Sequence, residues 1–567
     1  MAAGISHWKL GHFEVYNVNP PLVRMLATVP VLAAGPEVRW RGARIWRRPE
    51  FDLGREFVAA NGRRSLWLFT LARWATIPLS ILGGYFCWLW ARELYGREAG
   101  LFAVCLWCFS PSLLAYGQLL VPDVGATSIG VAAWYLFWRW LKRPTWGSAL
   151  WAGVAFGLVQ LTKTTWVILF GLWPMVWLVY RTRQPGYAAS VRCLGRELCQ
   201  LGLVLLLGTV VVNAGYGFEG SMRRLGQFEF VSKTLTGAGE LNYPLEKGNR
   251  FRESWAGALP IPLPANYVLG MDLQRSDFES KLWSYLRGQW KDGGWWYYYL
   301  YALAIKLPLG TWGLIVLALL ASLCCNGYAA SWRDEFVLLA PWLTILVLAS
   351  SQTGFSHHMR YVLPIFPFAF IWMSKVARAF QFGWRRNPDQ GRLPQRGKVK
   401  TNRVIAGIAA GALLWSVGSS LWVYPHSLSY FNELVGGPLG GHDHLDNSNI
   451  DWGQDLLYLK RWLDDHPEAS PLGLAHFWLV VDPRIVGIEY TTTPPGPDSL
   501  TARPPGLETT GPLPGWYAIS TNELHSRKRE YDYFLRIKPA AMAGYSIHIY
   551  HVTREDADRV RRELEGR

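Results

Sequence analysis

The feature that most constrains this chain is a series of apolar runs long enough to cross a membrane. A lipid hydrocarbon core is about 30 Å thick, so a spanning helix needs about 20 mostly apolar residues. Such runs start near Leu66, Leu101, Val124, Trp151, Thr164, Leu198, Leu300, Phe336, Tyr361 and Val404. The sequence therefore predicts a polytopic α-helical membrane protein with about ten spans, all of them before Tyr424.

Composition supports this fold class. Half of the 567 residues are hydrophobic, 32 are Trp, and the formal net charge is +16. The mean hydropathy is +0.08. These values exclude a disordered chain and an ordinary soluble protein, and no nucleic-acid partner is predicted. All seven Cys residues fall in predicted spans or at their cytoplasmic ends, so no disulfide framework is predicted on the outer side.

The distribution of Lys and Arg among the short loops predicts the orientation, because cytoplasmic loops carry an excess of both residues. One set of alternate loops carries only Lys163 and Arg360. The other set carries Arg92 and Arg97, then Arg139, Lys142 and Arg143, then Arg181, Arg183, Arg192 and Arg196, then Arg333, and the run from Lys375 to Arg403. The second set is therefore predicted to be cytoplasmic, with both chain ends outside.

Three pieces lie outside the membrane in this topology. Residues 1–65 form a first outer loop with an apolar stripe after Pro20 and Pro21, which suits a helix lying in the membrane interface. Residues 66–424 form the membrane domain. They include a long outer loop, residues 215–299, which is rich in aromatic side chains, and loops of this length are usually functional or internally folded.

Residues 425–567 are polar enough to form a small extracytoplasmic α/β domain. The segments "GWYAIS" and "YSIHIYHV" alternate like strands. In "SNIDWGQDLLYLKRWLDDH", Ser448 and Asp451 have the spacing of a capping box, and Leu456, Leu459 and Leu463 share one helix face. The stretch "TTTPPGPDSLTARPPG" indicates a proline-rich loop between these elements.

Four ionisable residues occur at the outer edge of the predicted spans. Charges at membrane depth are costly and indicate functional sites. The four are Asp123 in "LLVPDVGATS", Lys163 in "GLVQLTKTTW", Lys306 in "YALAIKLPLG" and Arg360 in "GFSHHMRYVLPIFP", where His357 and His358 precede the arginine. In the predicted topology all four lie at the same depth, although each belongs to a different hairpin.

Each residue also has a structural interpretation. Lys163 and Arg360 could extend to lipid headgroups, and Asp123 after Pro122 could cap a helix. His357 and His358 make a weak metal site, because adjacent side chains on a helix do not face one another. The occurrence of three cations and one carboxylate at the same depth favours a functional site.

The residue types indicate the chemistry of such a site. Three cations suit a lipid phosphate or diphosphate, which needs several donors. A carboxylate beside them could hold a divalent metal or act as a general base on a hydroxyl. The sequence therefore predicts group transfer from a lipid-phosphate donor at the outer leaflet, and composition alone leaves transport of the same lipid open.

Six motifs in order resemble a family of membrane glycosyltransferases. They are "HFEVYNVNPPLVRMLATVP", "LLVPDVGATS", "GLVQLTKTTW", "KLPLGTW", "RYVLPIFPF" and "YPHSLSYFNELVGG" followed by "DNSNIDWGQDL". The resemblance is to the GT-C class, in its family 39-like group of protein O-mannosyltransferases and aminoarabinose transferases. It implies a polyprenyl-phosphate sugar donor and inverting transfer to a hydroxyl of a protein, lipid or glycan. It also implies a protein of the inner (plasma) membrane with an extracytoplasmic active site.

The resemblance assigns roles residue by residue. Asp123 matches the acidic position of the second outer loop, where the resemblance implies that it helps to position the acceptor or a metal, and it is the catalytic candidate. Lys163, Lys306 and Arg360 match positions suited to the donor phosphate, and His357 and His358 are accessory candidates. A divalent metal is compatible with this set and is not required by it.

Part of the family's pattern has no match in this sequence. The first span of the family and its Asp-Glu pair are absent, so we expect Met1 to be an internal methionine of a longer natural protein. Two alternatives to the enzyme remain: a flippase for a lipid-linked sugar, and an inactive homologue that binds the lipid. A transporter needs polar groups at several depths, which favours the enzyme.

Overall fold

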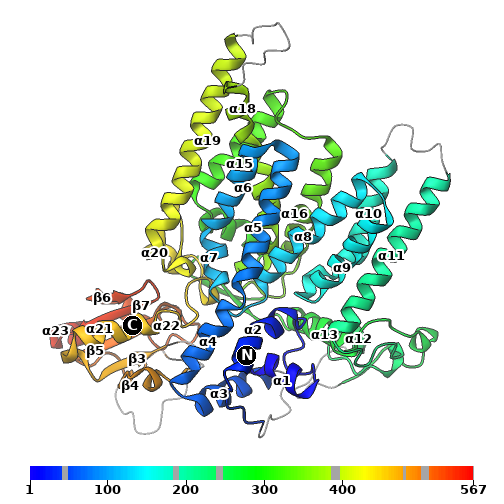
Figure 1. Cartoon of the computed structure of the whole chain (residues 1–567). Helices are drawn as coiled ribbons and strands as arrows, with labels where there is room; N and C mark the ends of the chain where they lie inside the picture. The colour runs from blue at the N-terminus through cyan, green and yellow to red at the C-terminus, as the bar shows by residue number, and fades with distance from the viewer. Residues whose placement is uncertain are drawn as a thin grey trace.

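The computed structural model describes residues 1–40, 49–182, 191–237, 247–384, 396–476, 481–497, 499 and 510–565. A bundle of long helices stands side by side, and the N-terminal and C-terminal parts gather at one end of it (Figure 1). The bundle consists of α5 (Ile77–Tyr95), α6 (Arg97–Cys108), α7 (Pro111–Gly117), α8 (Asp123–Lys142), α9 (Trp146–Gln160), α10 (Leu169–Thr182), α11 (Val191–Gly215), α14 (Tyr298–Lys306), α15 (Leu309–Cys324), α16 (Trp332–Ser351), α17 (Phe366–Met373), α18 (Arg378–Trp384) and α19 (Arg396–Val423). Three 3₁₀ segments complete it, η1 (Thr164–Ile168), η5 (Met359–Ile365) and η6 (Ser374–Ala377).

Helix α8 occupies the centre of the bundle. It packs on α5, on α9 and on η5, and nearly all of its side chains are buried. Gly130 on α8 makes this close packing possible, because a Cβ at this position would lie 2.2 Å from the Trp166 ring. The Trp166 indole in turn donates a hydrogen bond to the Ala126 carbonyl over 3.1 Å, which fixes the segment after α9 against α8.

The predicted class of helical membrane protein is confirmed, and the number of spans is only partly so. Each of the ten predicted starts falls in or at the edge of a helical segment. Among the described residues, five helices are long and apolar enough to cross a membrane, or seven if two bent pairs are each one span. Helices α9 and α10 are 15 and 14 residues long, which is short for a straight crossing. The count of ten spans therefore stays a prediction.

Among the described residues, four helices precede the bundle. They are α1 (Ala2–Leu10), α2 (Leu22–Ala33), α3 (Pro49–Asn61) and α4 (Arg64–Trp74). Helix α2 covers the predicted apolar stripe and buries Val23 and Val31, whereas Leu26 and Val29 are exposed. One face of α2 thus packs on α1 and α4, and its position in a membrane interface stays a prediction.

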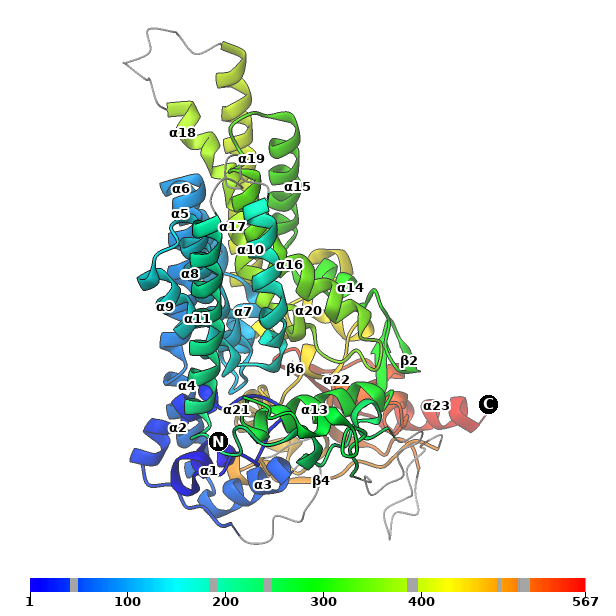
Figure 2. The same cartoon turned by 90° about the vertical axis from the view of Figure 1, so that its right-hand side faces the viewer.

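The described part of the long outer loop is internally folded. It contains α12 (Lys233–Thr236), α13 (Ala265–Glu279) and an antiparallel hairpin of β1 (Trp283–Leu286) and β2 (Gln289–Asp292). The Asp272 carboxylate of α13 accepts hydrogen bonds from the backbone of Val231 and Ser232, over 2.6 and 3.0 Å. Figure 2 shows α13 across the end of the bundle and β2 beside the C-terminal part.

The C-terminal part contains a five-stranded sheet with the order β4-β3-β5-β7-β6. Strand β3 is parallel to β4 and β5, and β7 is antiparallel to β5 and β6. Its elements are α21 (Leu456–Asp465), β3 (Leu472–Ala475), β4 (Tyr490–Thr492), β5 (Gly515–Ser520), α22 (Thr521–Leu524), β6 (Ala541–Ala543), β7 (Ile547–Val552) and α23 (Arg554–Glu565). Successive strand side chains point to opposite faces. Ile547 and Ile549 accordingly join the core under α21, and Val552 joins the core under α23.

The predicted capping box before α21 is wrong. Ser448 and Asp451 precede α21 by several residues, and neither side chain caps the helix. The Ser448 hydroxyl instead contacts His358 Nδ1 over 2.5 Å, and the Asp451 carboxylate accepts a hydrogen bond from Ser520 over 2.6 Å. Tertiary partners thus replace the local cap. Half of the predicted proline-rich loop and part of the basic run before Arg403 lie outside the described residues.

Candidate active site

Three segments meet where the sequence predicts a shared depth. Asp123 is the first residue of α8, Lys163 lies in the break between α9 and η1, and Arg360 is the second residue of η5. Helix α8 packs on both α9 and η5. The start of one helix and the two breaks therefore come together, and we call Asp123, Lys163 and Arg360 the Asp123 cluster.

The cluster joins two cations to one carboxylate. Lys163 Nζ lies 2.6 Å from Asp123 Oδ1, and Arg360 Nη1 lies 3.6 Å from Asp123 Oδ2. The exposed fractions of the Asp123, Lys163 and Arg360 side chains are 2%, 3% and 15%. Buried charges are stable only when they are paired, and here two positive groups share one negative group. The cluster therefore carries a net charge of +1 in a largely buried place.

Arg360 has hydrogen-bonding capacity to spare. Its guanidinium carbon lies 4.5 Å from the centre of the Trp452 ring, a cation–π contact. Its buried Nε has no hydrogen-bond partner among the residues that the structure describes. Buried donors are normally satisfied, and a guanidinium is well suited to an anionic oxygen. An anion bound here would complete the coordination of Arg360.

The two structural interpretations of these residues do not match the geometry. The Asp123 side chain makes no capping hydrogen bond, since α8 begins at Asp123 itself with Pro122 before it. Lys163 does not extend outward from the protein, because its ammonium is turned inward to Asp123. The buried ion pair accounts for both side chains.

Lys306 is not brought into contact with Asp123. Its ammonium donates to the backbone carbonyls of Leu428 and Asn449, over 2.8 and 2.7 Å, and lies 4.1 Å from the centre of the Phe431 ring. The predicted group of three cations is thus divided into two at the cluster and one at the joint that leads to the C-terminal part. A role for Lys306 at the donor phosphate stays a prediction.

The Asn449 carbonyl that receives Lys306 belongs to a clamp around the approach to Arg360. The Asn449 side chain donates to the His357 carbonyl over 2.8 Å and accepts from the Met359 amide over 3.0 Å. Ser448 contacts His358 Nδ1. The segment 448–452 therefore holds the backbone before η5 and also supplies Trp452, so it positions Arg360 from both sides.

His357 and His358 point to different partners and do not form a metal site together. His357 Nε2 contacts the Trp283 carbonyl, and His358 contacts Ser448. Burial lowers the pKa of both histidines, and in His358 the neighbouring Arg360 lowers the pKa further. Both are therefore neutral at physiological pH, and they act as hydrogen-bonding groups of the clamp.

The residues of the Asp123 cluster do not fit a divalent metal. Divalent cations need several oxygen ligands with negative charge. Among the described residues, both oxygens of the Asp123 carboxylate face a cation, which would repel a metal ion. By its charge the cluster would attract an anion and not a metal ion.

Sequence reasoning left part of the site unassigned. The string "DNSNIDWGQDL" was distinctive, but nothing in it indicated that Asn449 clamps η5 or that Trp452 covers Arg360. Tyr116 of α7 also reaches this segment and donates to the Ser448 carbonyl over 3.3 Å. The only signal was the density of Asn, Ser and Asp, which equally suits a loop.

An apolar groove lies beside this end of the bundle. It runs between α5, α6 and α7, and its volume is about 490 Å³. Residues that line it include Ser80, Tyr85, Trp107 and Leu114. Helix α7 thus places Leu114 in the groove and Tyr116 at the clamp, so the groove and the site share one short helix.

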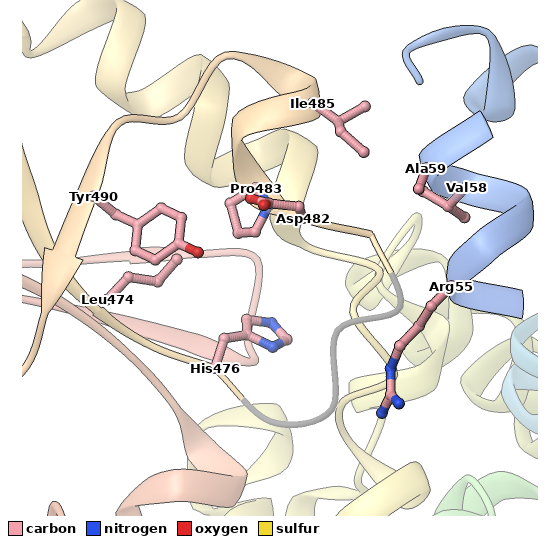
Figure 3. A pocket seen from close by; sticks show the side chains of 9 residues that line it. All are labelled: Arg55, Val58, Ala59, Leu474, His476, Asp482, Pro483, Ile485 and Tyr490. Carbon is pink, nitrogen blue, oxygen red and sulfur yellow. The ribbon is translucent and has the colours of Figure 1, made fainter. Parts of the chain in front are cut away.

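A second cavity of about 490 Å³ lies between α3 and the C-terminal sheet. Figure 3 shows Arg55 on the side of α3, with His476 and Tyr490 on the side of the sheet. It is lined by none of the predicted site residues. It is therefore separate from the Asp123 cluster.

One family model matches part of the chain. The family model described as dolichyl-phosphate-mannose-protein mannosyltransferase matches residues 68–210, the stretch that contains Asp123 and Lys163. The match covers this stretch and not the rest of the chain, so it relates residues 68–210 to that family.

Solved structures give a loose similarity. The crystal structure of ArnT from Cupriavidus metallidurans in the apo state is 14% identical, with a TM-score of 0.41, over 97% of this chain and 91% of that one. The same protein bound to undecaprenyl phosphate is 12% identical, with a TM-score of 0.41, over 97% of this chain and 92% of that one. No curated protein matches the sequence. The comparison that bears on function is therefore the sequence match of residues 68–210.

Proposed function

We propose that the chain transfers a sugar from a polyprenyl-phosphate donor to an acceptor hydroxyl on the extracytoplasmic side of the inner membrane. The observation that carries this proposal is the buried guanidinium of Arg360, whose Nε has no partner among the described residues. The family description of residues 68–210 supports a lipid phosphate sugar as the donor class. The acceptor is a hydroxyl of a protein, a lipid or a glycan.

Charge balance supports a phosphate ligand. A polyprenyl-phosphate sugar is a phosphodiester with one negative charge, which would neutralise the net charge of the Asp123 cluster. Arg360 would donate from Nε to a phosphate oxygen, and Lys163 would supply a second positive charge. The leaving polyprenyl phosphate is a monoester that gains further negative charge, so the two cations would stabilise the transition state more than the bound donor.

The proposed reaction is a single displacement at the sugar. The acceptor oxygen forms a bond to the anomeric carbon, and the bond from that carbon to the phosphate oxygen breaks. The acceptor proton passes to a carboxylate base, and Asp123 is the carboxylate of the cluster. In the free enzyme Lys163 occupies one oxygen of Asp123. A donor phosphate that attracts Lys163 would release that oxygen for the acceptor hydroxyl.

The apolar groove suits the polyprenyl chain of the donor. It joins the site through α7, and its lining is mostly aromatic and aliphatic. Burial of isoprene units there would contribute binding energy in proportion to the apolar area covered. We therefore place the phosphate at Arg360 and the lipid along α5, α6 and α7.

The orientation follows from the other end of the bundle. Basic residues predicted to be cytoplasmic, among them Arg139, Lys142 and Lys375, contact acidic residues Glu93, Asp334 and Glu335 there. Cytoplasmic ends carry the excess of Lys and Arg. The Asp123 cluster lies at the opposite ends of α8 and α5, so we propose that it faces outward.

The test is an assay with purified protein in lipid vesicles and a radiolabelled polyprenyl-phosphate sugar. Transfer of label to an acceptor fraction supports the proposal. Movement of the labelled lipid across the vesicle without transfer would show a flippase instead, and binding without either would show an inactive homologue. Cell fractions that contain the natural acceptors supply the acceptor in the first round.

A further inference from the structure

A second cluster of ionisable side chains lies away from Asp123. His442 and Asp443 belong to η10 (Gly441–Asp443), just after the bundle. His525 follows α22, and His548 lies on β7. Three segments of the C-terminal part thus bring three imidazoles and one carboxylate together, and we call these residues the His442 group.

Their ligand atoms converge. His442 Nδ1 lies 2.8 Å from His525 Nε2, and Asp443 Oδ1 lies 3.4 and 3.7 Å from these two nitrogens. Ligands about 2.0–2.1 Å from a tetrahedral zinc ion are about 3.3 Å apart. The observed separations bracket this value, so one ion fits among the three atoms after small adjustments.

His548 supplies a separate observation. It is 8% exposed, its ring centre lies 5.3 Å from that of His442, and its Nε2 has no hydrogen-bond partner among the described residues. An unsatisfied buried nitrogen beside two other imidazoles needs a partner. The ligand atoms of His442, Asp443 and His525 lie within 4.8 Å of one another, and His548 is outside this group. A metal ion held by these three residues would provide the missing partner, and the His548 ring would turn toward it to become the fourth ligand.

The surrounding residues orient these rings as a metal site requires. Metal-binding histidines usually engage their second nitrogen in a hydrogen bond. His525 Nδ1 contacts the Tyr285 hydroxyl over 3.3 Å, and His548 Nδ1 contacts the Tyr550 hydroxyl over 3.4 Å. In both rings Nε2 is thereby left for the metal.

We propose that His442, Asp443, His525 and His548 bind a divalent transition metal ion of the zinc class. Imidazole nitrogens with one carboxylate suit this class of ion. The Asp443 side chain is 65% exposed, which gives the ion a route from solvent. This proposal does not depend on the transferase reaction.

The ion would join three parts of the molecule. Tyr285 and Trp290 of the β1–β2 hairpin already donate to the backbone of residues 442 and 525, over 3.2 and 2.8 Å. The His442 group adds η10 and β7 to this junction. Segment 448–452, which clamps the approach to Arg360, follows η10 directly. The metal would therefore hold the C-terminal part in the position from which it supports Arg360.

The test measures metal content of the full chain, purified without a histidine tag. The protein is stripped with a chelator, exposed to excess Zn²⁺, desalted and analysed by mass spectrometry of the metal. We expect about one ion per chain in the wild type. The double variant His442→Ala and His525→Ala should retain less than about a tenth of that content. His551→Ala is the matched control, because His551 lies on β7 too but stacks on Trp516, and it should bind like the wild type.

A second measurement avoids any variant. Co²⁺ added to the stripped wild-type protein should give the visible absorption bands of a four-coordinate ion with nitrogen and oxygen ligands, and Zn²⁺ should remove them. Wild-type protein that retains no zinc and gives no such bands would overturn the proposal. So would a double variant with undiminished zinc content. Melting curves in excess chelator show whether the variants fold, since they should match the stripped wild type.

Discussion

Ion pairs at the two ends of the bundle differ in how many cations each carboxylate serves. At the predicted cytoplasmic end, Arg139 pairs with Glu93, Lys142 with Asp334, and Lys375 with Glu335. Each of these cations has its own carboxylate. In the Asp123 cluster one carboxylate serves both Lys163 and Arg360, so a positive charge is left over.

The carboxylates of the two ends also differ in their supporting contacts. Asp334 accepts hydrogen bonds from Trp138 and Ser331, over 2.7 and 2.6 Å, in addition to Lys142. Such a network is complete without a ligand, which is typical of a structural pair. Arg360 is buried with an unpartnered Nε. The difference teaches that charge alone does not mark the proposed site: the Asp334 carboxylate has its partners within the protein, whereas the Asp123 cluster has one more cation than carboxylates and a buried donor at Arg360.

The largest expected effect is that of Asp123→Asn on turnover. Removal of a general base typically costs about 10²- to 10⁴-fold in rate, so we expect kcat to fall at least about 100-fold. The matched control is Asp334→Asn, which removes a carboxylate at the other end. It should lower the melting temperature and leave kcat within about twofold, because it touches no reacting group. Equal losses of kcat in both variants would mean that Asp123 is structural.

The next largest expected effect is the loss of folding stability in Lys163→Met. Lys163→Met leaves the buried Asp123 carboxylate short of one partner, and breaking a buried pair costs about 3–5 kcal/mol. Lys142→Met breaks a pair whose lysine is 43% exposed, and such pairs contribute about 0–1 kcal/mol. Thermal unfolding in the same detergent should therefore separate the two variants clearly. A Lys163→Met protein as stable as Lys142→Met would show that Asp123 is not held by this ion pair.

A smaller effect, on the KM for the donor, is expected when the Arg360 guanidinium is replaced by an ammonium group. Arg360→Lys keeps the charge and removes the planar fork with its Nε, so the KM for the donor should rise about tenfold. Arg139→Lys, the control at the other end, should leave the KM unchanged. Titration with polyprenyl-phosphate sugar at saturating acceptor gives both values. An unchanged KM in Arg360→Lys would show that the donor phosphate does not bind at Arg360.

The smallest effect concerns the groove. Ser80→Trp places an indole in the groove between α5, α6 and α7, so the KM for a long polyprenyl donor should rise about threefold through lost apolar contact. A donor with a short lipid chain should show no change, because it does not reach the filled region. Equal KM values for the long donor in variant and wild type would place the lipid elsewhere.

The sequence predicted much of the cluster because hydrophobic runs fix depth. Asp123, Lys163 and Arg360 each stand at the end of an apolar run, and the constant thickness of a bilayer brings such ends to one level. The structure joins these three residues. Lys306 has the same sequence signal, yet it turns to the carbonyls of Leu428 and Asn449. Depth alone could not distinguish Lys306 from Lys163 and Arg360, because depth does not specify which neighbour a side chain contacts.

The sequence by itself determined the class of helical membrane protein and where the helical segments begin, and it predicted one level for the charged residues, since these follow from local hydrophobicity and length. Tertiary structure alone decided that Ser448 and Asn449 clamp the residues before Arg360, and that Trp452 covers it. It also decided that His442, His525 and His548 meet. These contacts join segments far apart in the chain, and their geometry depends on how whole elements pack, which no local pattern of residues specifies.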